Sequence, residues 1–268
     1  MSSAADKLAR LLIHSRLTNA KLQARLEVAS LAEAKLVVAN IIQLGRQLTP
    51  FGRQLGWKVG ATNDRSLKSL GLSAPFYGPL YENHCYSTQL IKSIDLNRFG
   101  RFRAAEAEFC FRMKDSLPPR SNGVPYGIEE VYDRIDCVIP AIEIAATRFE
   151  CDISAPLIVG DFAMNGCCIM GNDVSKPTHY DYFSTSVASL HVNDSQVSSS
   201  TGSNVLGNPV QAVTFLANEL NRDGFELSAG DIVMSGACCV CKVEAGDRLV
   251  VEFVGLSDLT ESVSVVIS

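Results

Sequence analysis

Apolar and polar positions follow two different periods along this chain, and the change falls near residue 55. In the first section, apolar side chains such as Leu8 and Leu12 recur at helical spacing. Asn19 offers a break between two such segments, and Pro50 follows the last of them. The sequence therefore predicts two or three helices over residues 1–55.

Beyond Gly56 the pattern becomes that of β-strands. Residues 104–113 (AAEAEFCFRM) alternate between apolar and polar positions, and residues 137–145 (CVIPAIEIA) form an apolar run. Two helices are expected to interrupt the strands, and Asn208 with Pro209 marks the start of the second. The helices are predicted at 128–135 and 209–222, a serine-rich loop at 198–203, and further strands at 57–59, 166–170, 186–197, 231–235, 239–243, 248–254 and 262–267.

These elements predict an α+β fold with a helical section over 1–55 and a β-rich domain over 56–268. The formal net charge of -5 and the absence of a basic stripe argue against a nucleic-acid partner. No apolar run approaches the ~20 residues of a membrane span. Residues 1–30 lack the apolar segment of a signal peptide. We therefore expect a cytoplasmic protein that binds neither nucleic acid nor membrane.

Nine cysteines are present, and their spacing is a poor framework for disulfides because two pairs are adjacent in sequence. We expect reduced thiols. Cys238 and Cys241 have the spacing of a zinc or redox pair, but the only other close thiols are the adjacent Cys167 and Cys168. Small thiols that fill the core are therefore favoured over a structural zinc site.

Two glutamates share one face of the predicted strand 104–113. Successive side chains of a strand point to opposite faces, so Glu106 and Glu108 lie on one face and Phe109 lies on the other. Two like charges this close repel each other unless a cation lies between them. Apolar flanks argue against an exposed edge strand, where water would screen the pair.

A third carboxylate, Glu143, stands inside the apolar run 137–145. An isolated ionised carboxylate in a buried strand is unfavourable unless it is paired or bound to a metal ion. Each glutamate alone could lie on the surface or pair with Arg103, Arg112 or Arg148. The three carboxylates together favour a hard oxygen site for Mg²⁺ or Mn²⁺.

Lys58, on the short predicted strand, is the candidate for proton transfer. It could be an ordinary solvated side chain. Beside a metal-bound carbonyl it could donate or accept a proton, because neighbouring positive charge lowers the pKa of an ammonium group. The four histidines have no metal-binding spacing, and the chain lacks a nucleophile elbow, a phosphate-binding loop and a dinucleotide fingerprint. Common hydrolases, NTPases and dehydrogenases are therefore disfavoured.

Short blocks of residues recur along nearly the whole chain in a specific order and spacing. They are GWKVGAT at 56–62, YGPL at 77–80, AEAE at 105–108, PAIEI at 140–144 with Arg148, GDFAMNG at 160–166 with Gly171, Asn208-Pro209 to Leu220, AGDIVMSG at 229–236 and AGD at 245–247. In this order they resemble the fumarylacetoacetate hydrolase superfamily, and in particular its 2-keto-4-pentenoate hydratase and 4-oxalocrotonate decarboxylase branch.

The resemblance implies a mixed β-roll or barrel-like catalytic domain with a bound Mg²⁺ or Mn²⁺, in a homo-oligomer. It implies a small 2-oxo acid as substrate and Lys58 as an active-site acid or base. The residues that match the metal ligands are Glu106, Glu108 and Glu143. The candidate substrate-binding residues are Arg148, Asp161 and Ser235.

Four positions depart from the pattern of that branch. Phe76 stands where an acidic residue often precedes Tyr-Gly, and Ala146 stands where an aspartate is common. Phe162 replaces the asparagine of an Asp-Asn pair, and residues 237–241 (ACCVC) replace a turn that usually contains proline. The metal triad is intact, whereas parts of the predicted pocket differ.

The expected activity is that of a hydratase, a hydro-lyase acting on a 2-hydroxy-2,4-dienoate or a related short 2-oxo acid. The carboxylate and 2-oxygen of the substrate would chelate the metal, and Lys58 or a water that it orients would move the proton. A decarboxylase or C–C hydrolase on the same platform is the nearest alternative, although a hydrolase would need a Glu–His pair that the sequence does not offer. A non-catalytic, ligand-binding member of the superfamily is the third.

Overall fold

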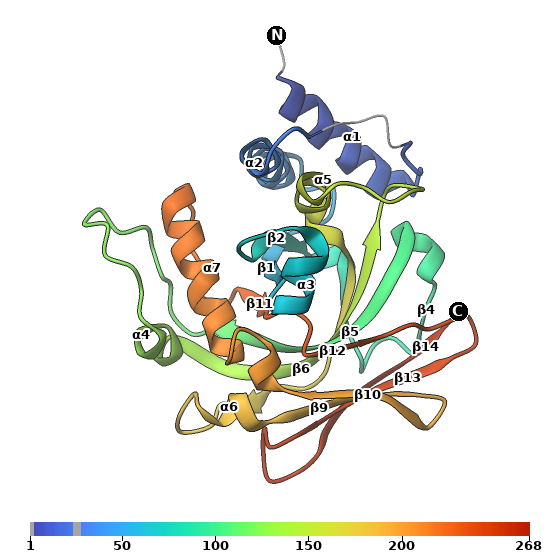
Figure 1. Cartoon of the computed structure of the whole chain (residues 1–268), viewed down its shortest axis with the longest axis vertical. Helices are drawn as coiled ribbons and strands as arrows, with labels where there is room; N and C mark the ends of the chain where they lie inside the picture. Colours follow the sequence, from blue (N-terminus) through green and yellow to red (C-terminus); the bar gives the residue numbers. More distant parts are fainter. Residues whose placement is uncertain (1–2, 24–27) are drawn as a thin grey trace.

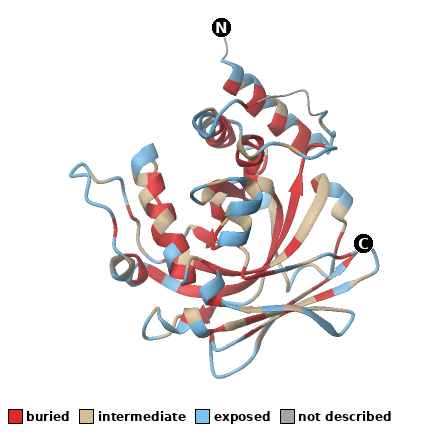
Figure 2. Cartoon of the chain, in the orientation of Figure 1, coloured by how far each residue is buried: buried red, intermediate tan, exposed pale blue. Residues whose placement is uncertain are grey.

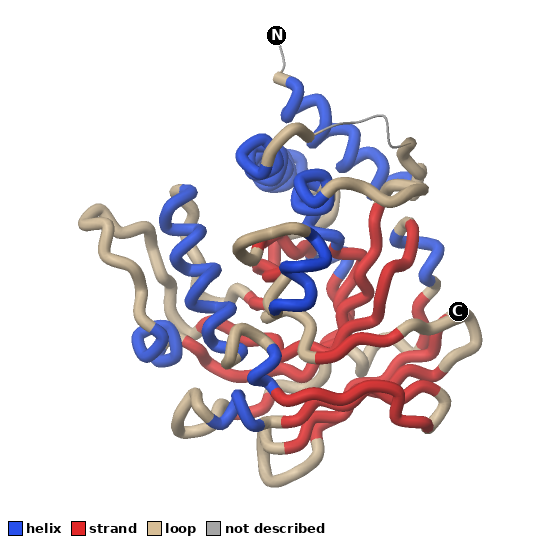
Figure 3. Tube along the Cα trace, viewed as in Figure 1, coloured by secondary structure: helices blue, strands red, loops and turns tan. Residues whose placement is uncertain are grey.

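The computed structural model describes residues 3–23 and 28–268, so the parts of the predicted helical section at 1–2 and 24–27 lie outside the described residues. Two sheets form the body of the described chain, and the helices gather at one end and along one side of them (Figures 1 and 3). The helices are α1 (Ala4–Thr18), α2 (Leu31–Leu48), α3 (Asp64–Leu70), α4 (Ile128–Asp133), α5 (Ala155–Gly160), α6 (Tyr182–Thr185) and α7 (Pro209–Asp223), with 3₁₀ turns η1 (Glu82–His84), η2 (Leu96–Phe99), η3 (Phe162–Met164) and η4 (Gly202–Asn204).

Helices α1 and α2 confirm the predicted helical character of the N-terminal section. Ser3 and Ser30 cap their first turns by accepting hydrogen bonds from backbone N–H groups. Asn19 ends α1 in the left-handed conformation, at the predicted break. The apolar faces of α1 and α2 are buried together with side chains of the β-strands in one continuous core (Figure 2). A domain boundary at residue 55 therefore stays a prediction.

The larger sheet of the described chain is curled, and its main path runs β2-β1-β11-β5-β6-β7-β3, with β12 beside β5 and β8 beside β6. Two long antiparallel strands, β5 and β6, form its centre. Its strands are β1 (Gln54–Gly60), β2 (Phe76–Tyr81), β3 (Cys85–Ser87), β5 (Arg101–Met113), β6 (Ile135–Thr147), β7 (Asn165–Met170), β8 (Val174–Ser175), β11 (Ile232–Met234) and β12 (Cys239–Cys241).

A second sheet packs on one face of the first. Phe109 of the larger sheet meets Phe253 of the smaller one edge to face, with ring centroids 5.2 Å apart, and it also contacts Phe183. Full burial of such a side chain contributes roughly 1.5–3 kcal/mol. The order of the smaller sheet is β10-β9-β13-β14-β4, with bounds β4 (Ser93–Ile94), β9 (Val187–Val192), β10 (Ser195–Thr201), β13 (Arg248–Val254) and β14 (Glu261–Ile267).

Opposite faces of the larger sheet carry two separate apolar clusters. Ala107, Phe109 and Phe111 belong to the main core beneath the second sheet. Cys110 and Ala141 belong to a smaller cluster on the other face. The alternation predicted for 104–113 is therefore confirmed. Because side chains alternate along a strand, the face of the smaller cluster is also the face that carries the glutamates.

The prediction of one strand over 186–197 is wrong. The chain instead forms the hairpin β9–β10, which turns at Asn193 and Asp194 with φ angles of 50° and 67°. Two consecutive residues with positive φ make the tight turn that matches the twist of paired strands, and asparagine and aspartate tolerate it. The predicted loop at 198–203 is wrong for the same reason, because β10 continues to Thr201.

Two further expectations concern thiols and membranes. All nine cysteines are free thiols, as the sequence predicts. Within residues 3–23 and 28–268, no helix has the length and hydropathy needed to cross a bilayer.

Candidate metal centre

The pairing of β5 with β6 brings the three predicted glutamates together. Glu106 lies directly opposite Glu143, and Glu108 follows on the same face of β5. One carboxylate oxygen from each residue lies within 4.8 Å of the other two. Glu108 and Glu143 are completely buried, whereas Glu106 is half-buried. The fold thus places three acidic side chains at one point in an apolar sheet.

Lys58 of β1 reaches the same cluster. Its Nζ lies 2.8 Å from Oε2 of Glu143, and the residue is 4% exposed. Burial lowers the pKa of Lys58, but the carboxylates of Glu143, Glu106 and Glu108 outweigh burial and hold that pKa above its ordinary value. This direction is opposite to the lowering expected from the sequence, because the groups around Lys58 in the described chain are negative.

One ammonium group does not compensate three carboxylates. Burial, followed by the charge of Glu143, raises the pKa of Glu106 to about 7. The same two causes raise the pKa of Glu108 well above its ordinary value. Oε1 of Glu108 has no hydrogen-bond partner among the described residues. The cluster therefore has both excess negative charge and an unused oxygen, which is the donor set that a hard divalent cation takes.

The other oxygen of Glu108 is held by the backbone. The N–H of Gly236, just after β11, donates a hydrogen bond of 2.8 Å to Glu108 Oε2. Gly236 has a φ of 96°, and a Cβ atom there would lie 2.2 Å from Oγ1 of Thr62. Glycine is therefore required at this position for both conformation and space.

Asn165, the first residue of β7, holds Glu143 and was not predicted from the sequence. Its Nδ2 donates a hydrogen bond of 2.8 Å to Glu143 Oε1. Arg16 of α1 in turn donates to the side-chain and backbone oxygens of Asn165. Each residue had a signal in the sequence: Asn165 is a polar residue at the start of an apolar strand, and Arg16 interrupts the apolar stripe of α1.

A cavity of about 540 Å³ opens beside the glutamates, with Lys58 and Glu106 in its wall. Glu108 and Glu143 are not part of that wall, so Glu106 is the carboxylate that faces the open space. The wall also includes part of α3 with Arg65, residues 198–200 of β10, and residues 236–240.

The departures from the expected pattern fall unequally around this cavity. Phe76 and residues 237–240 lie in its wall, so the differences there change the surface that a substrate would meet. Ala146 and Phe162 are buried in the main core instead. Phe162 packs edge to face against Phe51, with centroids 5.7 Å apart.

Arg148 and Asp161 form a buried ion pair away from the cavity wall. Arg148 Nε donates to Asp161 Oδ1 at 2.8 Å, and Asp161 Oδ2 accepts from Thr147 Oγ1 and from the Arg148 backbone N–H. Ser235 is buried next to Gly236, and its hydroxyl has no partner among the described residues. Contact of these three residues with a substrate stays a prediction, and for Arg148 and Asp161 this geometry does not favour it.

Sequence comparison gives relatives with named activities. The family described as fumarylacetoacetate (FAA) hydrolase, C-terminal, matches residues 117–264, a range that includes Glu143. The 2-keto-4-pentenoate hydratase of Paraburkholderia xenovorans is 30% identical over 73% of this chain and 70% of its own length. The 4-oxalocrotonate decarboxylase of a Pseudomonas species is 28% identical over 77% of this chain and 76% of its own.

Solved structures share the fold. The 4-oxalocrotonate decarboxylase from Pseudomonas putida, complexed with magnesium and adipate, superposes with a TM-score of 0.84 at 24% identity, over 98% of this chain and 97% of its own. The curled sheet, its glutamate-bearing face and the extended sequence match all lead to one assignment. The chain belongs to the fumarylacetoacetate hydrolase family.

Proposed function

We propose that Glu106, Glu108 and Glu143 bind one divalent cation, Mg²⁺ or Mn²⁺. The observation that carries this proposal is the convergence of three carboxylate oxygens within 4.8 Å, compensated among the described residues by Lys58 alone. The unpartnered Oε1 of Glu108 and the cavity beside Glu106 fit an ion that also takes ligands from water and substrate. Among solved structures with this fold, a 4-oxalocrotonate decarboxylase is complexed with magnesium and a fumarylpyruvate hydrolase with Mn²⁺ and pyruvate.

The chemistry follows from charge. A divalent ion at this position polarises the carboxylate and 2-oxygen of a bound 2-oxo acid and stabilises negative charge that develops on that oxygen. Lys58 Nζ, in the cavity wall, then moves the proton. A bound cation would offset the negative charge of the three carboxylates, which is what raises the pKa of Lys58. The pKa of Lys58 would then fall, and its ammonium group would become a better proton donor.

We infer that the protein is a hydro-lyase that adds water to a 2-hydroxy-2,4-dienoate or a related short 2-oxo acid. Lys58, or a water that it orients, donates a proton to the far carbon of the diene, C5, while the 2-hydroxyl gives up its own proton to water, so the dienol becomes a 2-oxo acid with one conjugated double bond. Water then adds across the remaining conjugated double bond. Relatives named 2-keto-4-pentenoate hydratase and 2-hydroxyhexa-2,4-dienoate hydratase support this class of substrate.

A decarboxylase is the second candidate, because relatives at 28% identity carry that name. It would use the same stabilised anion but break the bond to a carboxylate. A C–C hydrolase is disfavoured, because none of the four histidines lies in the cavity wall to activate water. Lys58, whose Nζ lies 2.8 Å from Glu143, is a basic residue of that wall in direct contact with the glutamates.

The test uses protein stripped of metal and then supplied with Mg²⁺ or Mn²⁺. Loss of dienoate absorbance that needs the added ion, without release of CO₂, is the expected result. Metal-dependent CO₂ release from an oxo-dicarboxylic acid would assign the decarboxylase instead. Metal binding without turnover of either compound would make the chain a non-catalytic member of the family.

We also infer a homo-oligomer in the cytoplasm, on the basis of the family resemblance and the composition. Sedimentation of the purified protein tests the first of these inferences. A single species at the monomer mass of 29.0 kDa would contradict it.

A further inference from the structure

We propose that Arg16, on the N-terminal helix α1, is a positioning residue for the metal centre. It orients the side-chain amide of Asn165, and that amide orients the carboxylate of Glu143. The inference rests on the proposed metal site, and it gives the N-terminal helices a task in the chemistry besides their packing.

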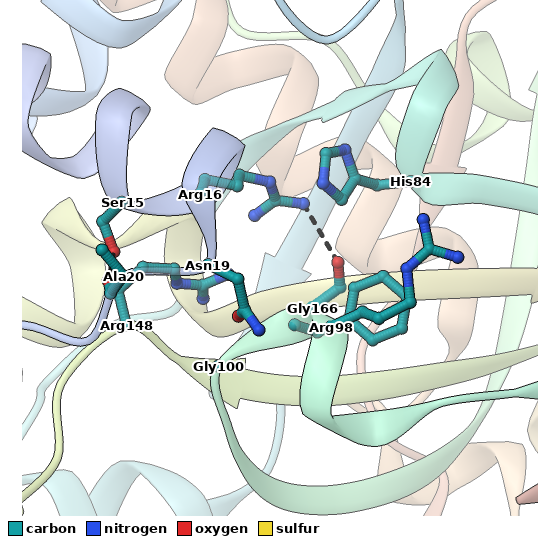
Figure 4. A pocket seen from close by; sticks show the side chains of 10 residues that line it. Ser15, Arg16, Asn19, Ala20, His84, Arg98, Gly100, Arg148 and Gly166 are labelled. Carbon is teal, nitrogen blue, oxygen red and sulfur yellow. Dashed lines mark hydrogen bonds between the residues drawn. The ribbon is translucent and has the colours of Figure 1, made fainter. Parts of the chain in front are cut away.

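Arg16 is 7% exposed, and its guanidinium is directed at one short segment of the chain. Nη1 donates to the backbone oxygen of Asn165 at 2.6 Å, and Nη2 donates to Asn165 Oδ1 at 2.9 Å. Nη2 also donates to the backbone oxygen of Gly166 at 3.1 Å, the bond drawn in Figure 4. The planar, forked guanidinium thus donates hydrogen bonds to both the backbone and the side chain of Asn165.

These contacts decide which way the Asn165 amide points. Because Oδ1 accepts from Arg16, Nδ2 faces the sheet, where it donates to Glu143 Oε1 at 2.8 Å. The reverse orientation would set the amide oxygen against a buried carboxylate and leave Arg16 facing an NH₂ group. Arg16 therefore selects the orientation that leaves Glu143 Oε2 for Lys58 and the proposed ion.

The segment leading into Asn165 needs such support. Phe162, Ala163 and Met164 all have positive φ angles, of 51°, 53° and 60°, which is unfavourable for residues other than glycine. Arg148 holds the start of the segment through Asp161 and its end through the Asn165 backbone oxygen. Arg16 adds the hydrogen bond to the Asn165 side chain, and its Cζ atom lies 4.5 Å from the Phe162 ring centroid.

A ligand site does not explain this arrangement better. Arg16, Arg98 and Arg148 line a small pocket with no carboxylate in its wall (Figure 4). The pocket measures about 10 Å³, which is room for about one water molecule. The Nη atoms of Arg16 already donate hydrogen bonds to Asn165 and Gly166. We therefore assign Arg16 the role of orienting Asn165 and not that of binding a ligand.

The experiment measures the dissociation constant of Mn²⁺ by calorimetry on full-length, metal-free protein. Arg16→Met and Asn165→Leu should each weaken Mn²⁺ binding about 10- to 100-fold, the usual range for groups that orient metal ligands. Because Arg16 acts through Asn165, the double variant should bind Mn²⁺ about as weakly as Asn165→Leu alone. Should Arg16→Met fail to fold, Arg16→Lys replaces it. Lysine keeps the positive charge but lacks the forked guanidinium, so Mn²⁺ binding should still weaken, although less than in Arg16→Met.

Leu12→Ala is the matched control, because Leu12 is buried on the same helix but has no polar contact with Asn165. It should lower the melting temperature while leaving the Mn²⁺ constant within about twofold of wild type. Unchanged affinity in the Arg16 variant, additive losses in the double variant, or an equal loss in Leu12→Ala would overturn the inference. Wild-type protein that binds no Mn²⁺ would instead contradict the proposed function.

Discussion

Two groups of buried charge lie close together in this protein, and they are built in opposite ways. Arg148 and Asp161 form a matched pair in which both oxygens of the carboxylate accept hydrogen bonds. Within residues 3–23 and 28–268, Glu106, Glu108 and Glu143 share a single ammonium group, that of Lys58. In that cluster one oxygen of Glu108 has no partner among the described residues, and burial and mutual repulsion raise the pKa of Glu106 and Glu108.

This difference distinguishes a buried charge that stabilises the fold from a buried charge that binds a metal ion. Both groups are buried, and both belong to the sequence blocks that resemble the family and contain the candidate site residues. Burial alone therefore does not identify a binding site. A carboxylate whose hydrogen bonds are complete stabilises the fold, whereas carboxylates left short of positive charge favour binding of a cation.

The largest effect is expected from Glu108→Gln. Removing one ligand should lower turnover of a dienoate by about 10³-fold or more, since the lost stabilisation is worth several kcal/mol. The same change removes repulsion, so the metal-free variant should unfold at the same or a higher denaturant concentration than wild type. Steady-state rates and urea unfolding measure the two effects. Full activity in this variant would contradict the assignment of Glu108 as a metal ligand, and with it the contrast to the Arg148–Asp161 pair.

Lys58→Met separates the proton donor from the ligands. The rate constant kcat should fall about 10²- to 10⁴-fold, the usual contribution of a positioned acid or base. Metal binding should persist, because the three carboxylates remain. Lys68→Met, on the cavity-lining helix α3 but outside the cavity wall, is the control and should leave kcat unchanged. Loss of metal together with activity would make Lys58 part of the ligand set instead.

Asp161→Asn tests the matched pair. It leaves the Arg148 guanidinium buried without its counter-ion, so the free energy of unfolding should fall by about 3–5 kcal/mol. Asp152→Asn is the control, because Asp152 pairs with Arg101 and Arg103 on the surface, where water screens the charges. Urea unfolding should detect little change in the control. Equal stability of both variants would show that the buried pair contributes no more than an exposed one.

The smallest effect concerns pH. Without a cation the pKa of Glu106 is raised to about 7, so binding of Mg²⁺ should weaken by about tenfold per pH unit as the pH falls below 7. In the metal-free protein the unfolded chain loses this proton near the ordinary pKa of 4.5, whereas the folded chain keeps it until about 7. Between these values the folded state binds more protons, so stability should fall as pH rises. Mg²⁺ affinity that stays constant from pH 5 to 8 would argue against a protonated Glu106 in the metal-free cluster.

The central strands and their three glutamates could be predicted because the relevant information is local. Alternation along β5 fixes the face of Glu106 and Glu108, and the apolar run around Glu143 shows that it is buried. The hairpin β9–β10 was missed because its turn depends on the conformations of Asn193 and Asp194, not on hydrophobic period. Helix α3 could not be predicted because none of its residues is fully buried, so its sequence shows no apolar stripe.

The groups that hold the glutamates could not be predicted because they come from distant segments. Arg16 and Asn165 are 149 positions apart, and Gly236 is 128 positions from Glu108. Such contacts exist only once helix α1, strand β7 and the turn after β11 have packed around the sheet. The family resemblance identified Arg148 and Asp161 as candidates for substrate binding but could not show that they pair with each other.

The most direct test is a Mn²⁺ titration of metal-free protein followed by electron paramagnetic resonance. The account predicts one tight site per chain in the wild type and no tight site in Glu108→Gln. Free Mn²⁺ throughout the wild-type titration, or a tight site that survives in Glu108→Gln, would contradict it.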